Sequence, residues 1–454
     1  MWNYGINVCN MLKRKISKQI ENQLKSGGDK MLVVDGARQI GKSFIIREIG
    51  SRLFPNFIEI NMEKDKQGDR LFAEAKTTEN FYLALSVVAG DRMSDKKSTL
   101  VFIDEIQAYD HLLTLVKFLM EDGRFTYIAS GSLLGVTLKK TQSIPIGSIT
   151  PLHMYPLDFE EFLWAAGFSE EQVEILLGYF HKKEKIPDII HAKLKSLYKE
   201  YRCVGGYPEA VKQYFDSNDF SLAWNKNKSL LFDIKGDPIK RKDSQGKSIY
   251  SATEISRIQK AFDLVLSSAF SEKSHFIASK IAGNGYQRQD AIDYLLNAGV
   301  IFKANNVENP SIPLVIKKIQ SQFRLYYSDI GMMTTLCGLD TIRALRQDKL
   351  GRNKGPLFEA AVADSLYKAD IPVYYFAKSS GLEVDFVISY QGYSTLIEVK
   401  AKSGTTRSSK TIRSHPEHYG ETKLIKFGDY NIGCENNMLT LPYYLAFALG
   451  KEGI

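Results

Sequence analysis

The chain has 454 residues, of which 44% are hydrophobic and 25% charged, and its formal net charge is +8. This balance excludes a disordered chain, and the length predicts about two to four domains. No apolar run approaches the roughly 18–20 residues of a membrane span, and Met1 to Gln19 lack the pattern of a secretory signal. The four cysteines are scattered without a C-x-x-C pair, so neither disulfides nor a zinc site is expected and a reducing cytoplasm fits.

A phosphate-binding loop is the strongest motif. The pattern G-x-x-x-x-G-K-S/T is met by Gly36, Ala37, Arg38, Gln39, Ile40, Gly41, Lys42 and Ser43. Met31–Asp35 before it reads as a buried strand and Phe44–Ile49 after it as a helix, so backbone N–H groups are expected to converge on phosphate oxygens. Lys42 is then predicted to reach the β- and γ-phosphates, and Ser43 to bind Mg²⁺. The loop predicts binding of ATP or GTP.

A second carboxylate motif follows a predicted strand. Ser98–Ile103 is apolar and leads into Asp104 and Glu105, a Walker B pattern. Strand ends of open α/β sheets face the nucleotide crevice, so Asp104 is expected to hold Mg²⁺ through water and Glu105 to polarise the attacking water. The alternative is that the two acids cap the following helix, Gln107–Glu121.

The remaining segments of this region alternate between strands and helices. Asn56–Asn61 and Leu152–Tyr155 read as strands, and Phe81–Val88 reads as a helix. Phe125–Ala129 is a further strand ending at Ser130-Gly131-Ser132, where Ser130 or Ser132 is either a polar sensor of the γ-phosphate or part of a plain turn. This alternation predicts a parallel sheet with helices on both faces, an α/β P-loop nucleotidase.

Five segments in order carry a family resemblance: Gly36–Ser43, Phe102–Gln107, Ser130–Ser132, Tyr155–Leu163 and Gly205–Ala210. Together they resemble the prokaryotic AAA-like ATPases whose C-terminal region is a domain of unknown function, over almost the whole chain. The resemblance implies ATP rather than GTP. The last two segments also have structural interpretations, because Asp158 with Glu161 predicts a capping box and Gly205 begins a predicted turn.

The chain departs from this family at one position. Many relatives have an arginine just before the fifth strand, where this chain has Gly147-Ser148-Ile149. The resemblance leaves Arg202 or an arginine of a neighbouring copy as the group that offsets transition-state charge. Because such an arginine contributes orders of magnitude in rate, hydrolysis is expected to be slow or to require a partner.

The middle of the chain predicts helices and then a winged-helix-like module. Helices are expected at Thr253–Ser267, His275–Ile281 and Arg288–Asn297, followed by a hairpin of Gly299–Ala304 and Phe323–Tyr327. In a DNA-binding interpretation, the residues facing DNA are Lys280, Arg288 and Gln289. The alternative, that the module packs a helical lid against the C-terminal domain, is favoured by Asp290 and Asp293, which phosphate would repel.

A second candidate site lies in the C-terminal region. The helix Gly355–Lys368, which carries Glu359, precedes strands Val373–Phe376, Glu383–Ser389 and Ser394–Lys400. Asp385 on one strand and Glu398-x-Lys400 on the next resemble the signature of the restriction-endonuclease-like core. Residues i and i+2 of a strand share a face, so Glu398 and Lys400 are expected to project together. Asp385 and Glu398 are then expected to bind Mg²⁺, with Glu359 completing the site and Lys400 orienting or deprotonating water. A surface face of alternating charges is the alternative.

These interpretations predict four domains: residues 1–165, a P-loop ATPase domain; 166–250, a helical lid and connector; 251–345, a winged-helix-like module; and 346–454, a restriction-endonuclease-like domain. The predicted function is a Mg²⁺-dependent ATPase coupled to a nuclease-like domain that interacts with nucleic acid. The expected partners are ATP, DNA or RNA and further copies of the chain, with Lys402, Arg407 and Lys410 as phosphate contacts. The alternatives are a nucleotide-controlled interaction switch on a degenerate nuclease fold, and a DNA-binding module dominated by the winged helix.

Overall fold

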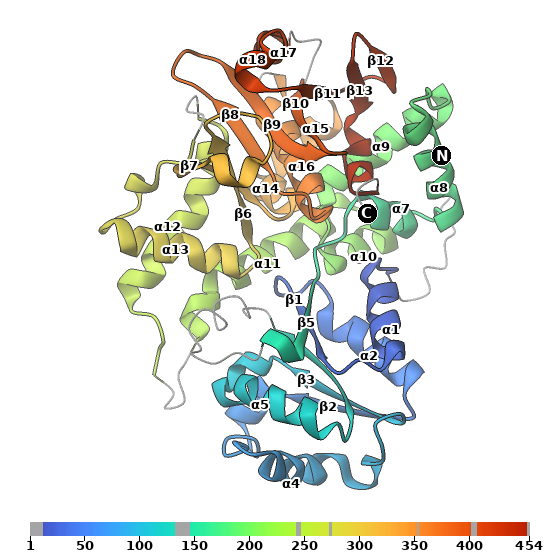
Figure 1. Cartoon of the computed structure of the whole chain (residues 1–454), viewed down its shortest axis with the longest axis vertical. Coiled ribbons are helices and arrows are strands. Elements are labelled where there is room, and N and C mark those ends of the chain that lie inside the picture. The colour runs from blue at the N-terminus through green and yellow to red at the C-terminus, as the bar shows by residue number, and fades with distance from the viewer. Residues whose placement is uncertain are drawn as a thin grey trace.

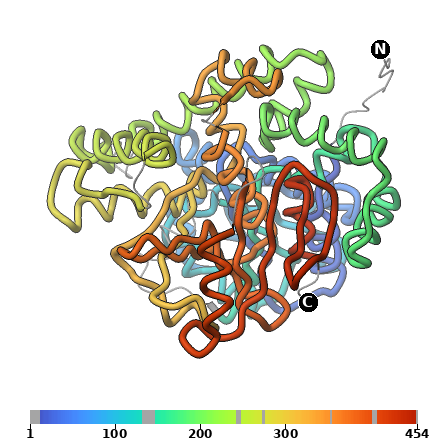
Figure 2. Tube along the Cα trace, turned by 90° about the horizontal axis from the view of Figure 1, so that it is seen from above, coloured from blue at the N-terminus to red at the C-terminus, as the bar shows by residue number. Residues whose placement is uncertain are grey.

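The structure, a computed structural model, describes residues 12–131, 146–241, 247–271, 275–351, 354–400 and 406–451. It contains two β-sheets separated by a layer of helices. Figure 1 shows the N-terminal sheet at the bottom, the C-terminal sheet at the top, and helices α10 (Pro208–Ser217) and α11 (Phe220–Lys240) between them. Figure 2, seen from above, shows the C-terminal strands lying over the N-terminal part of the chain.

The N-terminal sheet has five parallel strands in the order β2-β3-β4-β1-β5. Its strands are β1 (Met31–Asp35), β2 (Asn56–Asn61), β3 (Thr99–Asp104), β4 (Thr126–Gly131) and β5 (Ile149–His153). The predicted parallel α/β sheet is therefore confirmed, with β4 inserted between the strand before the phosphate loop and the strand before Asp104. The described helices of this part are α1 (Ile16–Ser26), α2 (Lys42–Leu53), α3 (Met62–Gln67), α4 (Thr78–Ala89) and α5 (Asp110–Asp122).

The two faces of this sheet bury different cores. Leu32 and Val34 of β1 face a large cluster that includes α1 and α2, whereas Met31 and Val33 face a second cluster with α4 and α5. Every residue of β3 is buried, which explains its continuous apolar sequence. The carboxyl ends of β1 and β3 thus lie at the same end of the sheet, and this brings the phosphate loop close to Asp104.

Five helices follow the first sheet. They are α7 (Phe159–Ala165), α8 (Glu170–Lys182), α9 (Asp188–Val204), α10 and α11. Asp158 caps α7 by accepting a hydrogen bond from the backbone N–H of Glu161, as predicted. The reciprocal half of the predicted capping box is wrong, because the Glu161 carboxylate instead accepts from the backbone N–H of Lys15 and pairs with Arg14.

The winged-helix prediction fails in two respects. Residues 275–281 contain only a short 3-10 turn, Ala278–Lys280, where a full helix is expected. The flanking elements are α12 (Ala252–Ala269), α13 (Gly285–Asn297), β6 (Ile301–Val307), β7 (Lys318–Tyr327), α14 (Ile330–Leu336) and α15 (Leu339–Arg346). The β6–β7 hairpin is not a free wing, because Asn305 and Asn306 pair with Tyr374 and Tyr375 of β8. The expected boundary at residues 345 and 346 therefore crosses one continuous sheet.

This C-terminal sheet has eight strands in the order β12-β13-β11-β10-β9-β8-β6-β7. Its later elements are α16 (Lys354–Lys368), β8 (Tyr374–Ala377), β9 (Glu383–Tyr390), β10 (Tyr393–Val399), α17 (Arg407–Arg413), α18 (Pro416–Tyr419), β11 (Thr422–Gly428), β12 (Gly433–Glu435), β13 (Met438–Pro442) and a terminal 3-10 segment, Tyr443–Lys451. β8, β9 and β10 are successively antiparallel, and β11 runs parallel to β10 after α17.

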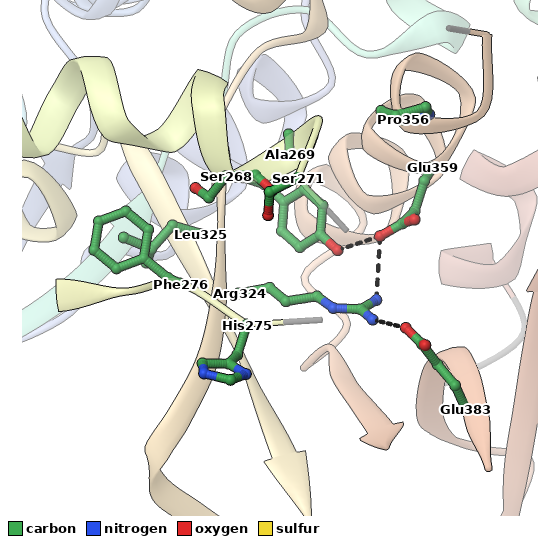
Figure 3. A pocket seen from close by; sticks show the side chains of 11 residues that line it. Ser268, Ala269, Ser271, His275, Phe276, Arg324, Leu325, Pro356, Glu359 and Glu383 are labelled. Atoms are coloured by element: carbon green, nitrogen blue, oxygen red, sulfur yellow. Dashed lines mark hydrogen bonds and ion pairs between the residues drawn. The ribbon is translucent and has the colours of Figure 1, made fainter. Parts of the chain in front are cut away.

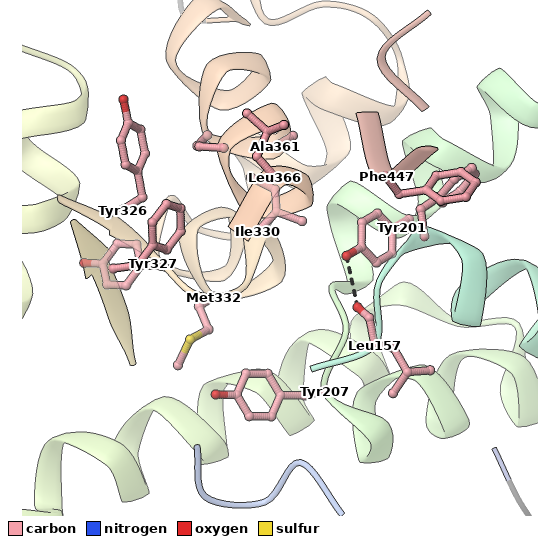
Figure 4. Packing of buried hydrophobic residues seen from close by; sticks show 14 of the residues in the cluster. Leu157, Tyr201, Tyr207, Tyr326, Tyr327, Ile330, Met332, Ala361, Leu366 and Phe447 are labelled. Atoms are coloured by element: carbon pink, nitrogen blue, oxygen red, sulfur yellow. Dashed lines mark hydrogen bonds between the residues drawn. The ribbon is translucent and has the colours of Figure 1, made fainter. Parts of the chain in front are cut away.

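One hydrophobic core joins the helical layer to both sheets. Figure 4 shows Tyr207 of the segment before α10, Tyr327 of β7 and Leu366 of α16 in the same packed cluster, together with Phe447 near the C-terminus. The helical layer is thus a shared core of the molecule rather than a detached lid. In the described parts of the chain, every helix is too short or too polar to cross a membrane.

Candidate functional site

The phosphate loop is shaped by two glycines with positive φ. Gly36 follows β1 with φ 137°, and Gly41 has φ 95° and is the N-cap of α2. A Cβ at Gly36 would lie 2.2 Å from the backbone oxygen of Met154, so a larger residue does not fit there. The loop is therefore a tight backbone cradle at the N-terminus of α2, a geometry that suits a phosphate group.

Lys42 folds back onto this cradle. Its Nζ donates hydrogen bonds to the carbonyl oxygens of Gly36 and Ala37, at 2.8 and 2.7 Å. The side chain is buried, and burial lowers the pKa of Lys42 to about 8 although Glu105 and Asp104 favour the charged form. An ammonium whose partners are weak neutral acceptors is ready to exchange them for phosphate oxygens.

Asp104 at the end of β3 is the meeting point of three further strands and helices. Its carboxylate accepts hydrogen bonds from Ser43 Oγ at 2.9 Å, from Asn61 Nδ2 at 2.8 Å and from Ser130 Oγ. Ser43 and Asp104, predicted as Mg²⁺ ligands, are thus brought together. Asn61 was missed by the sequence analysis, because nothing in a strand ending in asparagine indicates which carboxylate it meets. Ser132, the other sensor candidate, lies outside the described residues.

Glu105 adopts the left-handed conformation, with φ 51°, directly after Asp104. Its carboxylate accepts a hydrogen bond from Gln107 Nε2. The alternative that these two acids cap the next helix is wrong, since α5 begins at Asp110 with Tyr109 as its N-cap. Because Glu105 does not cap α5, its carboxylate remains near the phosphate loop, where its charge acts on Lys42.

The tip of the loop faces α11. Arg38 forms an ion pair with Asp237, and Gln39 Nε2 donates to Asp233 Oδ2 at 3.3 Å. Ile40 contributes a backbone oxygen that accepts from Arg14 Nη1 at 2.8 Å. The predicted loop residues therefore form one continuous turn from β1 into α2, and the side chains of Arg38 and Gln39 contact α11 of the helical layer.

Arg202, one of the two predicted sources of a transition-state arginine, is not available to this loop. Its side chain is buried, and the guanidinium lies 4.1 Å from the ring centroid of Phe358 on α16. Burial also lowers the pKa of Arg202. The residue is a packing element between α9 and α16, and its prediction as a phosphate-contacting arginine is wrong for this conformation.

Three of the four residues predicted for the C-terminal site lie together. Lys400 Nζ lies 2.5 Å from Glu398 Oε2 and 3.6 Å from Asp385 Oδ2. Asp385 Oδ2 also accepts from the backbone N–H of Val399 at 2.7 Å, which fixes it against the neighbouring strand. Burial and the charge of Asp385 raise the pKa of Glu398. Ser409 Oγ of α17 donates to Glu398 Oε1.

Glu359, the fourth residue, points elsewhere. Its carboxylate accepts from Tyr326 Oη at 2.6 Å and lies 3.2 Å from Arg324 Nη1 (Figure 3). Arg324 also pairs with Glu383 and donates to the backbone oxygen of Asp385 at 3.2 Å. The side chains of Arg324, Glu359 and Glu383 line a cavity of about 120 Å³. Within the described ranges, no three His, Cys, Asp or Glu side chains come together as a metal site, so the predicted three-carboxylate set is not assembled.

The predicted nucleic-acid contacts have mixed outcomes. Arg288 is half-buried, and its Nε donates to the backbone oxygen of Ile281 at 2.8 Å. Gln289 pairs with Asp293 on its own helix, at 2.9 Å, while Lys280 is exposed. Arg407 and Lys410 are exposed on α17. Lys402 lies outside the described residues.

Comparison with known proteins follows the same division. Residues 28–163 match the family model of an AAA domain. This part of the chain is therefore similar to an AAA domain, which supports a P-loop fold that binds nucleotide. Residues 354–444 and 195–343 match two domains of unknown function, DUF4143 and DUF8612. No curated protein matches the chain.

Among solved structures, a Walker-type ATPase of Pyrococcus abyssi is similar at 14% identity over 72% of this chain and 96% of its own, with a TM-score of 0.41. The S. cerevisiae Hsp104–ADP complex is similar at 10% identity, covering 80% and 43%, with a TM-score of 0.29. The RuvB Holliday junction branch migration motor of Thermotoga maritima is similar at 13% identity, covering 64% and 89%, with a TM-score of 0.28. At such TM-scores these likenesses carry no inference about the chain.

A buried ionic cluster joins the two sheets. Lys368 Nζ, at the end of α16, contacts Asp329 Oδ2 at 2.9 Å, Asp364 Oδ2 at 3.0 Å and the Leu157 backbone oxygen at 3.2 Å. Asp329 Oδ2 also accepts from the backbone N–H of Gly206 at 2.6 Å. The segments Tyr155–Leu163 and Gly205–Ala210 therefore both contact this cluster, the first through Lys368 and the second through Asp329. No sequence signal identified this cluster, because its members lie on four separate segments.

Proposed function

We propose that the protein is a Mg²⁺-dependent ATPase whose C-terminal domain is nuclease-like and engages nucleic acid. The observation that carries the ATPase proposal is the hydrogen bond of 2.9 Å between Ser43 and Asp104 beside a glycine-backed loop. A hydroxyl and a carboxylate in this position suit a hard cation bound to phosphate oxygens. The cradle fits a phosphate because only glycine is accommodated at residue 36.

The chain's own residues divide the chemistry of hydrolysis. Lys42 leaves the carbonyl oxygens of Gly36 and Ala37 and binds the β- and γ-phosphates. Ser43 and Asp104 would hold Mg²⁺, which would stabilise charge on the phosphate oxygens as a Lewis acid. Asn61 and Ser130 orient the Asp104 carboxylate. Glu105 accepts the proton of the attacking water once it exchanges its bond to Gln107.

The topology of the C-terminal domain supports the nuclease-like part of the proposal. The order α16-β8-β9-β10-α17-β11, with β10 antiparallel to β9 and parallel to β11, brings Asp385 beside Glu398 and Lys400. Asp385 and Glu398 would hold a divalent cation. Burial disfavours the charged ammonium of Lys400, but the two carboxylates outweigh it and raise its pKa. Lys400, which contacts both carboxylates, would orient water or help to deprotonate it.

A second function is favoured by the position of Arg324. Its guanidinium neutralises Glu359 and Glu383 and reaches the backbone of Asp385. This arginine holds the third carboxylate away from the other two. In a nucleotide-controlled interaction switch on a degenerate nuclease fold, a guanidinium such as that of Arg324 would neutralise these carboxylates in place of a metal ion and so stabilise the fold.

Two matched variants separate these functions. Lys42→Ala is expected to abolish ATP turnover, and Asp385→Ala to abolish cleavage of DNA or RNA while ATP turnover continues. Cleavage of DNA and of RNA is tested with Mg²⁺ and with Mn²⁺. Glu435→Ala serves as the control, because it removes an exposed acid on β12, at the far side of the same sheet. Hydrolysis of ATP without any nicking by wild type rejects the nuclease, and the absence of salt-sensitive binding then favours the switch.

A further inference from the structure

Arg38 occupies an unusual place for an ion-paired arginine. It lies within the phosphate loop, two residues after Gly36 and four before Lys42. Its partner Asp237 belongs to α11, nearly 200 residues later, and the side chains of Arg38 and Asp237 are 41% and 8% exposed. The guanidinium is partly exposed to solvent, so a phosphate group can reach it and compete with Asp237 for it.

Asp237 keeps two partners on one of its oxygens when Arg38 leaves, although among the described residues Oδ1 pairs with Arg38 alone. Its Oδ2 accepts from Tyr294 Oη at 2.6 Å and from Arg241 Nε at 3.1 Å. A buried carboxylate that lost its only partner would be strongly destabilised, but this one keeps a hydroxyl and a second guanidinium. Arg38 is therefore the exchangeable member of the cluster.

Two other arginines near the loop or expected to serve it are committed elsewhere. Arg14 binds the backbone oxygens of Ile40 and Tyr155, at 2.8 and 2.5 Å, and lies 3.2 Å from Glu161. Arg202 is buried against Phe358. Arg38, by contrast, belongs to the loop itself. Burial is the main cause that lowers the pKa of Lys42, and the charge of Arg38 lowers it further, as expected for two cations close to the same phosphate site.

We propose that Arg38 is the arginine that contacts the γ-phosphate of bound ATP, and that Asp237 holds it aside while the loop carries no triphosphate. The inference rests on the proposed ATPase function and supplies the cation that Ser148 does not. Exchange of Asp237 for phosphate oxygens also removes one of the two side-chain contacts described between the loop and α11, and leaves the one from Gln39 to Asp233. Because α11 packs against α12 and α14, this exchange reports the nucleotide state to the helical layer.

The test compares Arg38→Ala with Arg52→Ala, which removes an arginine of the same domain whose ion pairs, within the described residues, are with the half-buried Glu21 and Glu48. Arg38→Ala is expected to lower kcat by about 10³-fold or more, with a smaller change in KM. Addition of free guanidinium is expected to restore part of the rate. Arg52→Ala is expected to keep the wild-type kcat.

A binding measurement separates a catalytic role from a folding defect. Wild type and Arg38→Ala are titrated with ADP and with ADP plus aluminium fluoride, a mimic of the transferring phosphoryl group. Arg38→Ala is expected to bind ADP normally and to lose the tighter binding that aluminium fluoride gives wild type. Asp237→Asn is expected to lower the KM for ATP by up to about fivefold.

The outcomes distinguish the two levels of the argument. If wild type shows no turnover above Lys42→Ala, the proposed ATPase function itself fails. If wild type turns over and Arg38→Ala keeps both its kcat and its response to aluminium fluoride, the assignment of Arg38 is overturned. Loss of ADP binding together with turnover in Arg38→Ala would also overturn it, since Arg38 would then shape the loop rather than contact the γ-phosphate.

Discussion

Lys368→Met tests whether the buried ionic cluster holds the two sheets together. The variant keeps most of the side-chain volume but removes the ammonium from between Asp329 and Asp364, whose side chains are fully buried. Breaking a buried ion pair from one side costs about 3–5 kcal/mol. The Leu157 carbonyl also loses one of its donors. Against a total of about 5–15 kcal/mol for a folded domain, the loss is large.

The pH dependence gives the same prediction a signature that packing alone lacks. Burial raises the pKa of Asp364 from 3.8 to about 7, against the opposing charge of Lys368. The folded protein therefore binds more protons than the unfolded chain between these values, and its stability falls as the pH rises from about 4 to 7. The full change is about 4 kcal/mol. Asp364→Asn removes this titration, so its stability should lack that decline.

Urea denaturation followed by tryptophan fluorescence measures both effects. The free energies of unfolding of wild type, Lys368→Met, Asp364→Asn and the double variant are compared from pH 4 to 8. The reasoning is refuted if Lys368→Met loses less than about 1 kcal/mol, the worth of an exposed pair. It is also refuted if wild type and Asp364→Asn show the same pH profile.

Three further outcomes concern the nucleotide site. Gly36→Ala places a Cβ 2.2 Å from the Met154 oxygen, so ATP affinity measured by calorimetry should fall at least about tenfold, and unchanged affinity would show that the cradle is not needed. Asn61→Ala removes a hydrogen bond to the Asp104 carboxylate that contributes about 1.5–3 kcal/mol. Half-maximal turnover should then need about 10- to 100-fold more Mg²⁺. An identical Mg²⁺ titration of variant and wild type would show that Asn61 does not orient Asp104. Burial lowers the pKa of Lys42 to about 8, so in the nucleotide-free protein this side chain should lose its charge above that pH, and the affinity of wild type for ATP should decline there. The affinity of Lys42→Arg should stay constant, because a guanidinium keeps its charge. Parallel pH profiles of the two proteins would contradict the lowered pKa of Lys42.

The parts of this molecule that sequence reasoning reached are those encoded by contiguous residues. The phosphate loop, β2 and the Asp104-Glu105 pair each lie within a single short segment whose period and residue types specify both structure and position. The strands carrying Asp385 and Glu398 were also located, because alternation on neighbouring strands fixes which side chains share a face.

The parts that escaped prediction depend on pairings between distant segments. The β6–β7 hairpin has the local pattern of a wing, and only its pairing with β8 makes it part of a larger sheet. Glu359 lies on the expected helix, yet Arg324 of β7 determines where its carboxylate points. Lys368 and Asn61 find their partners across the fold, which no spacing along the chain encodes.

ATP turnover by the purified full chain is the measurement that tests the central claim most directly. Wild type and Lys42→Ala are assayed with and without Mg²⁺, across protein concentrations, and with DNA or RNA added. The account predicts Mg²⁺-dependent turnover in wild type that Lys42→Ala lacks and that nucleic acid changes. Equal turnover in the two proteins, or none in wild type under any of these conditions, would contradict it.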